Sequence, residues 1–182
     1  MQINTKTGLI ETAQYIPSPN ADARPEHTDI DLMVIHSISL PPGEYGGPWI
    51  EQLFTNTLPA DEHPYFREIY QLKVSSHVLI RRDGTIQQFV PFHQRAWHAG
   101  ASCYEGRETC NDYSIGIELE GSDDSEFEDI QYLQLAELIK ALELSYKKIN
   151  KDRLTGHSDI APGRKTDPGS GFDWDRLSNL LS

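Results

Sequence analysis

The sequence predicts a single domain of the mixed α/β class. Strand-like and helix-like segments alternate along the chain and do not separate into an all-strand and an all-helix half. The chain length agrees with a single domain, because 182 residues with 37% hydrophobic side chains suffice for one hydrophobic core and are too few for two independent domains. No internal repeat or low-complexity tract indicates another organisation. We therefore expect one domain over residues 1–182.

The first half of the chain predicts a buried strand, a short helix and a hairpin. Residues 31–40 (DLMVIHSISL) contain the β-branched apolar run of a buried strand, which the turn residues PPGEYGG end. A proline in the first turn favours a short helix over 48–54. Residues 55–72 are expected to form a long loop. Two strand-like runs within 75–90 surround an Asp-Gly pair, which tolerates the positive φ of a tight hairpin turn.

The second half predicts one more strand and two helices. Residues 113–121 (YSIGIELEG) alternate apolar and polar side chains, so one face should be apolar and the other should carry the carboxylates. The acidic run 123–129 reads as a solvated helix start that the helix dipole favours, and the leucines after it repeat with the period of a helix. Residues 172–181 predict a closing amphipathic helix.

The charge balance excludes two classes of partner. Lys and Arg number 16 and Asp and Glu 28, which gives a net charge of −12. Such a chain repels polyanions, so we expect neither nucleic acid nor a membrane as a partner. The N-terminal residues lack a basic flank before an apolar run, and no stretch reaches the roughly 20 apolar residues of a membrane span. These features predict a cytoplasmic protein.

Ionisable residues are concentrated in 154–169 (LTGHSDIAPGRKTDPG), where glycines and prolines predict a long loop without regular structure. His157 lies in this stretch, and His36 ends the buried strand predicted earlier. Two histidines and one carboxylate are a common zinc-binding set. Spacing alone leaves both Asp159 and Asp167 open as the third ligand. A lone His36 would more often be an ordinary buried histidine.

Four segments resemble, in the same order, the AmpD-type N-acetylmuramyl-L-alanine amidases, which are zinc enzymes of the amidase and peptidoglycan-recognition fold. The resemblance covers about residues 15–178. It implies a central mixed β-sheet flanked by helices, with one zinc ion per chain at an edge of the sheet. The segments are VIHSISLPPGEYGGPW, SSHVLIRRDGTIQQFVPFHQRAWHAG, CNDYSIGIELEG and TGHSDIAPGRKTDPG.

The resemblance also assigns roles to individual residues. His36, His157 and Asp167 match the zinc ligands, because the third ligand of the family follows a lysine by two residues and precedes Pro-Gly. Glu118 matches the catalytic glutamate, which takes a proton from water and returns it to the leaving nitrogen. Lys165 matches the catalytic lysine, whose charge suits a developing oxyanion.

Other positions are less specific. Trp97 and His98, in AWHAG, match a family motif at the edge of the groove, where Trp97 suits a sugar or lactyl contact or is simply packed. His77 is expected to support the ligands or the structure. Peptide contacts stay open at three positions, namely Ser37 where many relatives have asparagine, Thr109 where some have arginine, and Lys73.

The resemblance implies hydrolysis of the amide between N-acetylmuramic acid, in its 1,6-anhydro form, and the L-alanine of a stem peptide. The expected substrate is a small muropeptide released for peptidoglycan recycling. One alternative is an exported amidase that acts on intact cell wall, which an upstream signal sequence would support. Another is a non-catalytic peptidoglycan-binding module, which loss of a zinc ligand or of the glutamate would mark. All five matched positions are intact.

Overall fold

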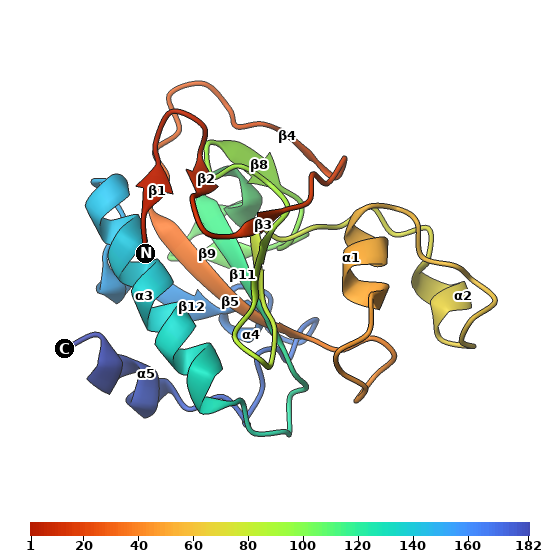
Figure 1. Ribbon diagram of the computed structural model, residues 1–182. Helices are drawn as coiled ribbons and strands as arrows, with labels where there is room; N and C mark the ends of the chain where they lie inside the picture. Colours follow the sequence, from red (N-terminus) through yellow and green to blue (C-terminus); the bar gives the residue numbers. More distant parts are fainter.

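A six-stranded mixed β-sheet forms the centre of the computed structural model, which describes residues 1–182 (Figure 1). Strands β12, β5, β11 and β6 run parallel to one another, β7 is antiparallel to β6, and β3 is parallel to β7. This arrangement confirms the expected central mixed sheet. In sheet order the strands are β12 (Leu154–Gly156), β5 (Leu32–Ile38), β11 (Ser114–Glu120), β6 (Val78–Ile80), β7 (Ile86–Gln88) and β3 (Gln14–Tyr15).

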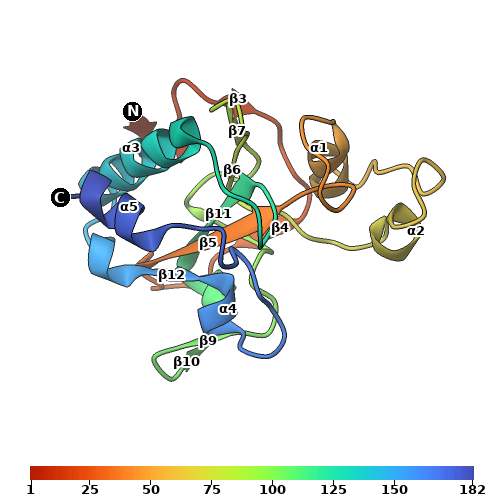
Figure 2. The ribbon, with the colours of Figure 1, turned by 90° about the horizontal axis from the view of Figure 1, so that it is seen from below.

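Two helices cover one face of this sheet, α3 (Asp129–Ser145) and α5 (Trp174–Leu180), as Figure 2 shows. The main core lies between them and the strands. Alternate side chains of the central strands reach this core, and α3 meets them with the leucines of its predicted stripe. Both helical predictions are confirmed. The core residues include Met33, Ile35, Ile115, Ile117, Leu119, Leu135, Leu138, Ile139, Leu142 and Leu177.

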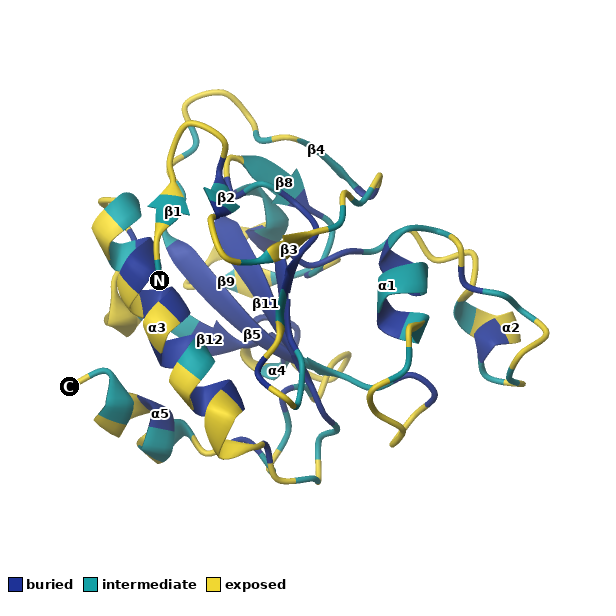
Figure 3. Ribbon diagram, in the orientation of Figure 1, coloured by how far each residue is buried: buried dark blue, intermediate teal, exposed yellow.

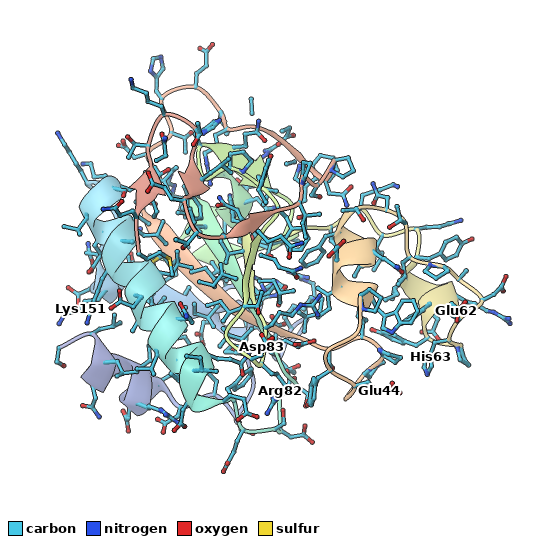
Figure 4. The ribbon with its side chains drawn as sticks, viewed as in Figure 1. Glu44, Glu62, His63, Arg82, Asp83 and Lys151 are labelled. Atoms are coloured by element: carbon cyan, nitrogen blue, oxygen red, sulfur yellow. The ribbon has the colours of Figure 1, made fainter.

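The segment after β5 leaves the sheet and carries two short helices, α1 (Trp49–Phe54) and α2 (Phe66–Ile69) (Figure 1). Helix α1 confirms the prediction for 48–54, whereas α2 lies within residues expected to be loop. A four-residue helix is too short to show a period in the sequence. It forms around Phe66, which is fully buried and lies with its ring 5.3 Å from that of Trp49. Glu62 and His63 lie in the loop before α2 (Figure 4).

The hairpin prediction is confirmed, because β6 and β7 pair around a turn that contains Arg82 and Asp83 (Figure 4).

Smaller elements complete the chain. None of the helices combines the length and apolar content that crossing a membrane requires. The three two-stranded antiparallel sheets pair β1 (Ile3–Asn4) with β2 (Leu9–Ile10), β4 (Ala21–Ala23) with β8 (Gln94–Ala96), and β9 (Cys103–Tyr104) with β10 (Arg107–Glu108), and 3-10 turns lie at Cys110–Asp112 and Lys151–Arg153.

Strand β11 alternates as predicted, and every one of its residues is buried, including those of the face that carries the carboxylates (Figure 3). One local expectation needs correction. The stretch 154–169 is not wholly irregular, because it begins with β12 and continues into α4 (His157–Ile160). Pairing with β5 explains this strand, since three residues extend a parallel sheet that is already formed.

Candidate functional site

Three side chains converge where β5, β12 and the loop after α4 meet. The Nδ1 atoms of His36 and His157 lie 2.9 Å apart, and each is 3.0 Å from Oδ2 of Asp167. Local structure explains the convergence. His36 alternates with Ile35, so it leaves the face of β5 that packs against α3, and His157 directly follows β12, the parallel neighbour of β5. The loop returns Asp167 to the same point.

These three donors suit a metal cation. Nε2 of His157 lies 3.1 Å from the carbonyl oxygen of Ala99 and must donate its proton there, because a carbonyl only accepts. Its Nδ1 then presents a lone pair. Burial lowers the pKa of His36 to about 4, so that imidazole is neutral at neutral pH. Two imidazoles and one carboxylate, with all donor atoms within 4.8 Å of one another, form a set that zinc accepts.

Asp159, the other aspartate left open by spacing, has a different position. Its Oδ2 accepts hydrogen bonds from the hydroxyl of Thr155 at 3.1 Å and from the backbone N–H of Gly156 at 2.9 Å. The side chain therefore holds the turn from β12 into α4. The structure brings Asp167, and not Asp159, together with the two histidines.

Glu118 lies on β11 opposite His36 on β5, in the parallel register of the two strands. Its Oε2 is buried and has no hydrogen-bond partner. Burial raises the pKa of Glu118 well above its usual value, the charge of Asp167 raises it further, and the charge of Lys165 opposes both. A carboxyl group with a raised pKa binds a proton more readily than an ordinary glutamate, so it can serve as general base and then as general acid.

A cavity of about 690 Å³ opens over these groups. Its volume is within the usual range for small-molecule sites. Much of its apolar lining comes from the segment that carries α1 and α2, and its polar lining comes mainly from β5, β11 and the loops that follow β5, β11 and α4. The residues that line the cavity include all five matched positions, His36, Glu118, His157, Lys165 and Asp167, together with the apolar Leu53, Phe54, Tyr65, Ile69 and Leu72.

The less specific candidate residues of the sequence analysis differ in whether they line the cavity. Trp97 is half-buried and does not line this cavity, and its backbone N–H and C=O pair with Asn20 and Ser75. Ser37 lines the cavity, whereas Lys73 and Thr109 do not.

His98 and His77 extend the group of histidine rings that begins at His36. His98 lines the cavity, and its Nδ1 is 3.0 Å from Nε2 of His36, so it contacts a predicted ligand directly. His77 contacts no predicted ligand. Its Nδ1 accepts from the backbone N–H of Gly116 and its Nε2 donates to the carbonyl of Gln94, so it joins two strands.

Sequence reasoning assigned Asp123 to a solvated helix start, and that assignment is wrong. Helix α3 begins only at Asp129, and Asp123 lines the cavity. Its carboxylate accepts hydrogen bonds from the hydroxyls of Ser37 and Thr166, the neighbours of His36 and Asp167 in the chain. Asp123 thus links two segments that carry predicted ligands. Its position just after a parallel strand was the available signal, since such strand ends share one edge of a sheet.

Comparison with known proteins finds amidases similar to this chain in sequence and in structure. Residues 26–170 match the family model described as N-acetylmuramoyl-L-alanine amidase. A Salmonella typhimurium protein named 1,6-anhydro-N-acetylmuramyl-L-alanine amidase AmpD is 57% identical over 96% of this chain and 93% of its own. A crystal structure of a selenomethionine AmpD derivative covers 100% of both chains at 54% identity, with a TM-score of 0.96. The Escherichia coli amidase AmiD in complex with the substrate anhydro-N-acetylmuramic acid-L-Ala-D-γ-Glu-L-Lys is 31% identical, covers 86% of this chain and 60% of its own, and has a TM-score of 0.60.

Proposed function

The chain belongs to the N-acetylmuramoyl-L-alanine amidase family, and we propose that its site hydrolyses the amide between 1,6-anhydro-N-acetylmuramic acid and the L-alanine of a stem peptide during peptidoglycan recycling. One observation carries the proposal. The buried, unpartnered carboxyl of Glu118 lies over the same cavity as three converging metal donors and the ammonium of Lys165. The AmpD relatives support the anhydro sugar, and the AmiD complex supports a muropeptide as the ligand.

In this proposal His36, His157 and Asp167 hold one zinc ion per chain. Zinc supplies Lewis acidity when bound, which acidifies a water ligand and polarises a carbonyl. The protein fixes the donors beforehand, because β5 and β12 are paired and Asp167 is held by a loop tied to Asp123. The donor atoms therefore need little rearrangement for metal binding.

Glu118 and Lys165 perform the remaining steps. Glu118 accepts a proton from the attacking water and returns it to the alanine nitrogen as the amide bond breaks. Its raised pKa suits both directions of transfer, since it binds a proton more readily than an exposed glutamate does. Lys165 carries its positive charge at the cavity wall, where it stabilises negative charge that develops on the carbonyl oxygen.

The same proposal covers the rest of the chain. Residues 1–182 act as one amidase domain, and Trp97 contacts the sugar or lactyl part of the substrate beyond the cavity. The partner is a small muropeptide and not a nucleic acid. We place the protein in the cytoplasm, where muropeptides imported during recycling are processed.

The test compares a defined anhydromuropeptide with intact sacculi, using purified zinc-loaded protein and mass spectrometry of the released peptide. The wild type should release the stem peptide from the muropeptide and little from sacculi. Glu118→Gln should lower the rate by about 10²- to 10⁴-fold, which is the usual contribution of a general base. Glu62→Gln, the same change at an exposed position, should leave the rate unchanged.

Three outcomes would contradict the proposal. The first is absence of free peptide with the wild type, and the second is an undiminished rate with Glu118→Gln. The third is release mainly from sacculi, which would favour a wall-degrading amidase.

A further inference from the structure

We propose that Ser114 and His98 form a hydrogen-bond relay that fixes the tautomer of His36, so that Nδ1 of His36 presents its lone pair to the metal. The inference rests on the proposed metal-binding function. It makes Ser114 and His98 positioning residues, because they act through His36 and neither belongs to the group of three metal donors.

The relay consists of three short contacts in series. The hydroxyl of Ser114 lies 2.6 Å from the carbonyl oxygen of Cys110. The Oγ atom of Ser114 is 3.0 Å from Nε2 of His98. Nδ1 of His98 is in turn 3.0 Å from Nε2 of His36. Nδ1 of His36 then faces His157 and Asp167.

The direction of the relay follows from its first member. A carbonyl oxygen only accepts, so the hydroxyl proton of Ser114 points to Cys110. The Oγ of Ser114 must then accept from Nε2–H of His98. A neutral imidazole carries a single ring proton, so Nδ1 of His98 is an acceptor and takes the proton of His36 Nε2–H. Nδ1 of His36 is left without a proton, which is the form that binds a metal.

The opposite direction of proton donation along the relay is unfavourable for two reasons. It would remove the hydroxyl donor from the buried carbonyl of Cys110, and it would place a proton on Nδ1 of His36. That proton would point into the space between His157 and Asp167 and block a metal ion there.

The surroundings of His98 are shaped to hold its ring. Gly116 lies on the same face of β11 as Ser114 and Glu118, and a Cβ atom there would be 2.4 Å from Cγ of His98. Glycine therefore leaves room for the imidazole. The side-chain oxygen of Asn111 accepts from the backbone N–H of His98 at 3.1 Å and from that of Ala99 at 2.8 Å. The carbonyl of Ala99 binds Nε2–H of His157, so one segment orients both predicted histidine ligands.

Ser114→Ala tests the relay in two ways. In metal-free protein labelled with ¹⁵N-histidine, the ring nitrogen shifts of wild-type His36 should report an unprotonated Nδ1 and a protonated Nε2. In the variant this single tautomer should be lost, and zinc should bind about 10- to 100-fold more weakly in competition with a chelator. Ser76→Ala is the matched control. It removes a buried hydroxyl that donates to the carbonyl of Val78 and bonds to no histidine, and it should change neither value.

Substitution of His98 gives a second test that does not depend on the folding of Ser114→Ala. His98→Gln keeps an oxygen acceptor for His36 Nε2–H and an N–H donor for Ser114, so it should retain the tautomer and most of the zinc affinity. His98→Leu keeps neither group and should lose both.

Two results would overturn the relay: a proton on Nδ1 of wild-type His36, or values for Ser114→Ala and His98→Leu that match those of Ser76→Ala. Failure of the proposed function is a separate outcome. It would appear as a wild-type protein that shows the expected tautomer in its metal-free form but binds no zinc and releases no peptide.

Discussion

Glu118 occupies a position that a stable strand would normally give to an apolar side chain. Both neighbours of β11 in the sheet are present, its own residues are all buried, and Oε2 of Glu118 receives no hydrogen bond. Burial raises the pKa of this carboxyl group well above its usual value. The same property that suits Glu118 to proton transfer therefore makes its ionised form unfavourable in the folded protein.

Glu118→Gln should make the metal-free protein more stable at alkaline pH. The folded pKa of Glu118 is raised above the unfolded one, so the contribution of the wild-type carboxyl is fully present in acid and is lost as pH rises through the folded pKa. Gln carries no charge and avoids this loss. We expect a gain of about 1–3 kcal/mol near pH 8 and almost none near pH 4, measured by urea unfolding.

The exposed Glu62→Gln serves as the control and should show no such pH dependence. An equal effect of Glu118→Gln at both pH values would argue against a buried, ionising carboxyl group.

The two aspartates of 154–169 should respond differently to truncation. Asp167→Ala removes one of three converging donors and should lower the zinc content of purified protein severely. Asp159→Ala removes an acceptor for the backbone N–H of Gly156, and should cost about 1 kcal/mol of stability while leaving zinc content nearly unchanged. Metal analysis together with thermal unfolding separates the two effects. Loss of zinc in Asp159→Ala but not in Asp167→Ala would show that Asp159, and not Asp167, is the metal ligand.

Strand β11 carries two different faces within seven residues. Ile115, Ile117 and Leu119 enter the core under α3, while Ser114, Gly116 and Glu118 lie on the opposite face, which holds His98 and the cavity. The period of two is visible in the sequence, so the strand and its polar face could be predicted. That the polar face is buried could not, because burial depends on segments distant in the chain.

Gly116→Ala should destabilise the protein through a clash with His98. A Cβ atom would lie 2.4 Å from its ring, and relief of such overpacking typically costs about 1–3 kcal/mol. The effect should shrink when His98 is also replaced by alanine, because the ring that causes the clash is then absent. A double-mutant cycle measured by urea unfolding checks this coupling. An equal loss of stability from Gly116→Ala with and without the His98 ring would show that the clash is not with His98.

Elements with a strong period were predictable and very short ones were not. Helix α3 and the hairpin of β6 and β7 follow from patterns of leucines and from an Asp-Gly turn. Helices α2 and α4 have four residues each, and strand β12 has three. These form because Phe66 and β5 offer a surface to pack or pair against, so the cause is tertiary contact that a local pattern does not contain.

The site was predictable mainly through resemblance. Residue chemistry alone gave two histidines and two candidate aspartates, and the family motif chose Asp167, which the structure places beside both histidines. The contacts of Asp123 and Ser114 with Thr166 and His98 could not be predicted, because these partners lie elsewhere in the chain. The sequence does not show which residue a side-chain hydroxyl or carboxyl group will hydrogen-bond.

Zinc should stabilise the folded chain as a unit, because its predicted ligands belong to three separate segments. A ligand that binds only the native state adds about 2.7 kcal/mol at a free concentration 100 times its Kd. Calorimetry with and without zinc should show a rise in Tm of several degrees, reversed by a chelator. Asp167→Ala should abolish the rise. A Tm that does not respond to zinc in the wild type would contradict metal binding at this site.

The three predicted metal donors lie far apart in the sequence, and this spacing determines when they can come together during synthesis of the chain. His36 and His157 are 121 residues apart, and His36 and Asp167 are 131 apart. During synthesis His36 emerges long before the other two, and it has no second metal donor beside it until β12 has joined the sheet next to β5. The proposed zinc ion can therefore bind with all three donors only after Asp167 has been synthesised and β12 has paired with β5. Under the proposed function, the amidase gains its activity only after this last donor is in place.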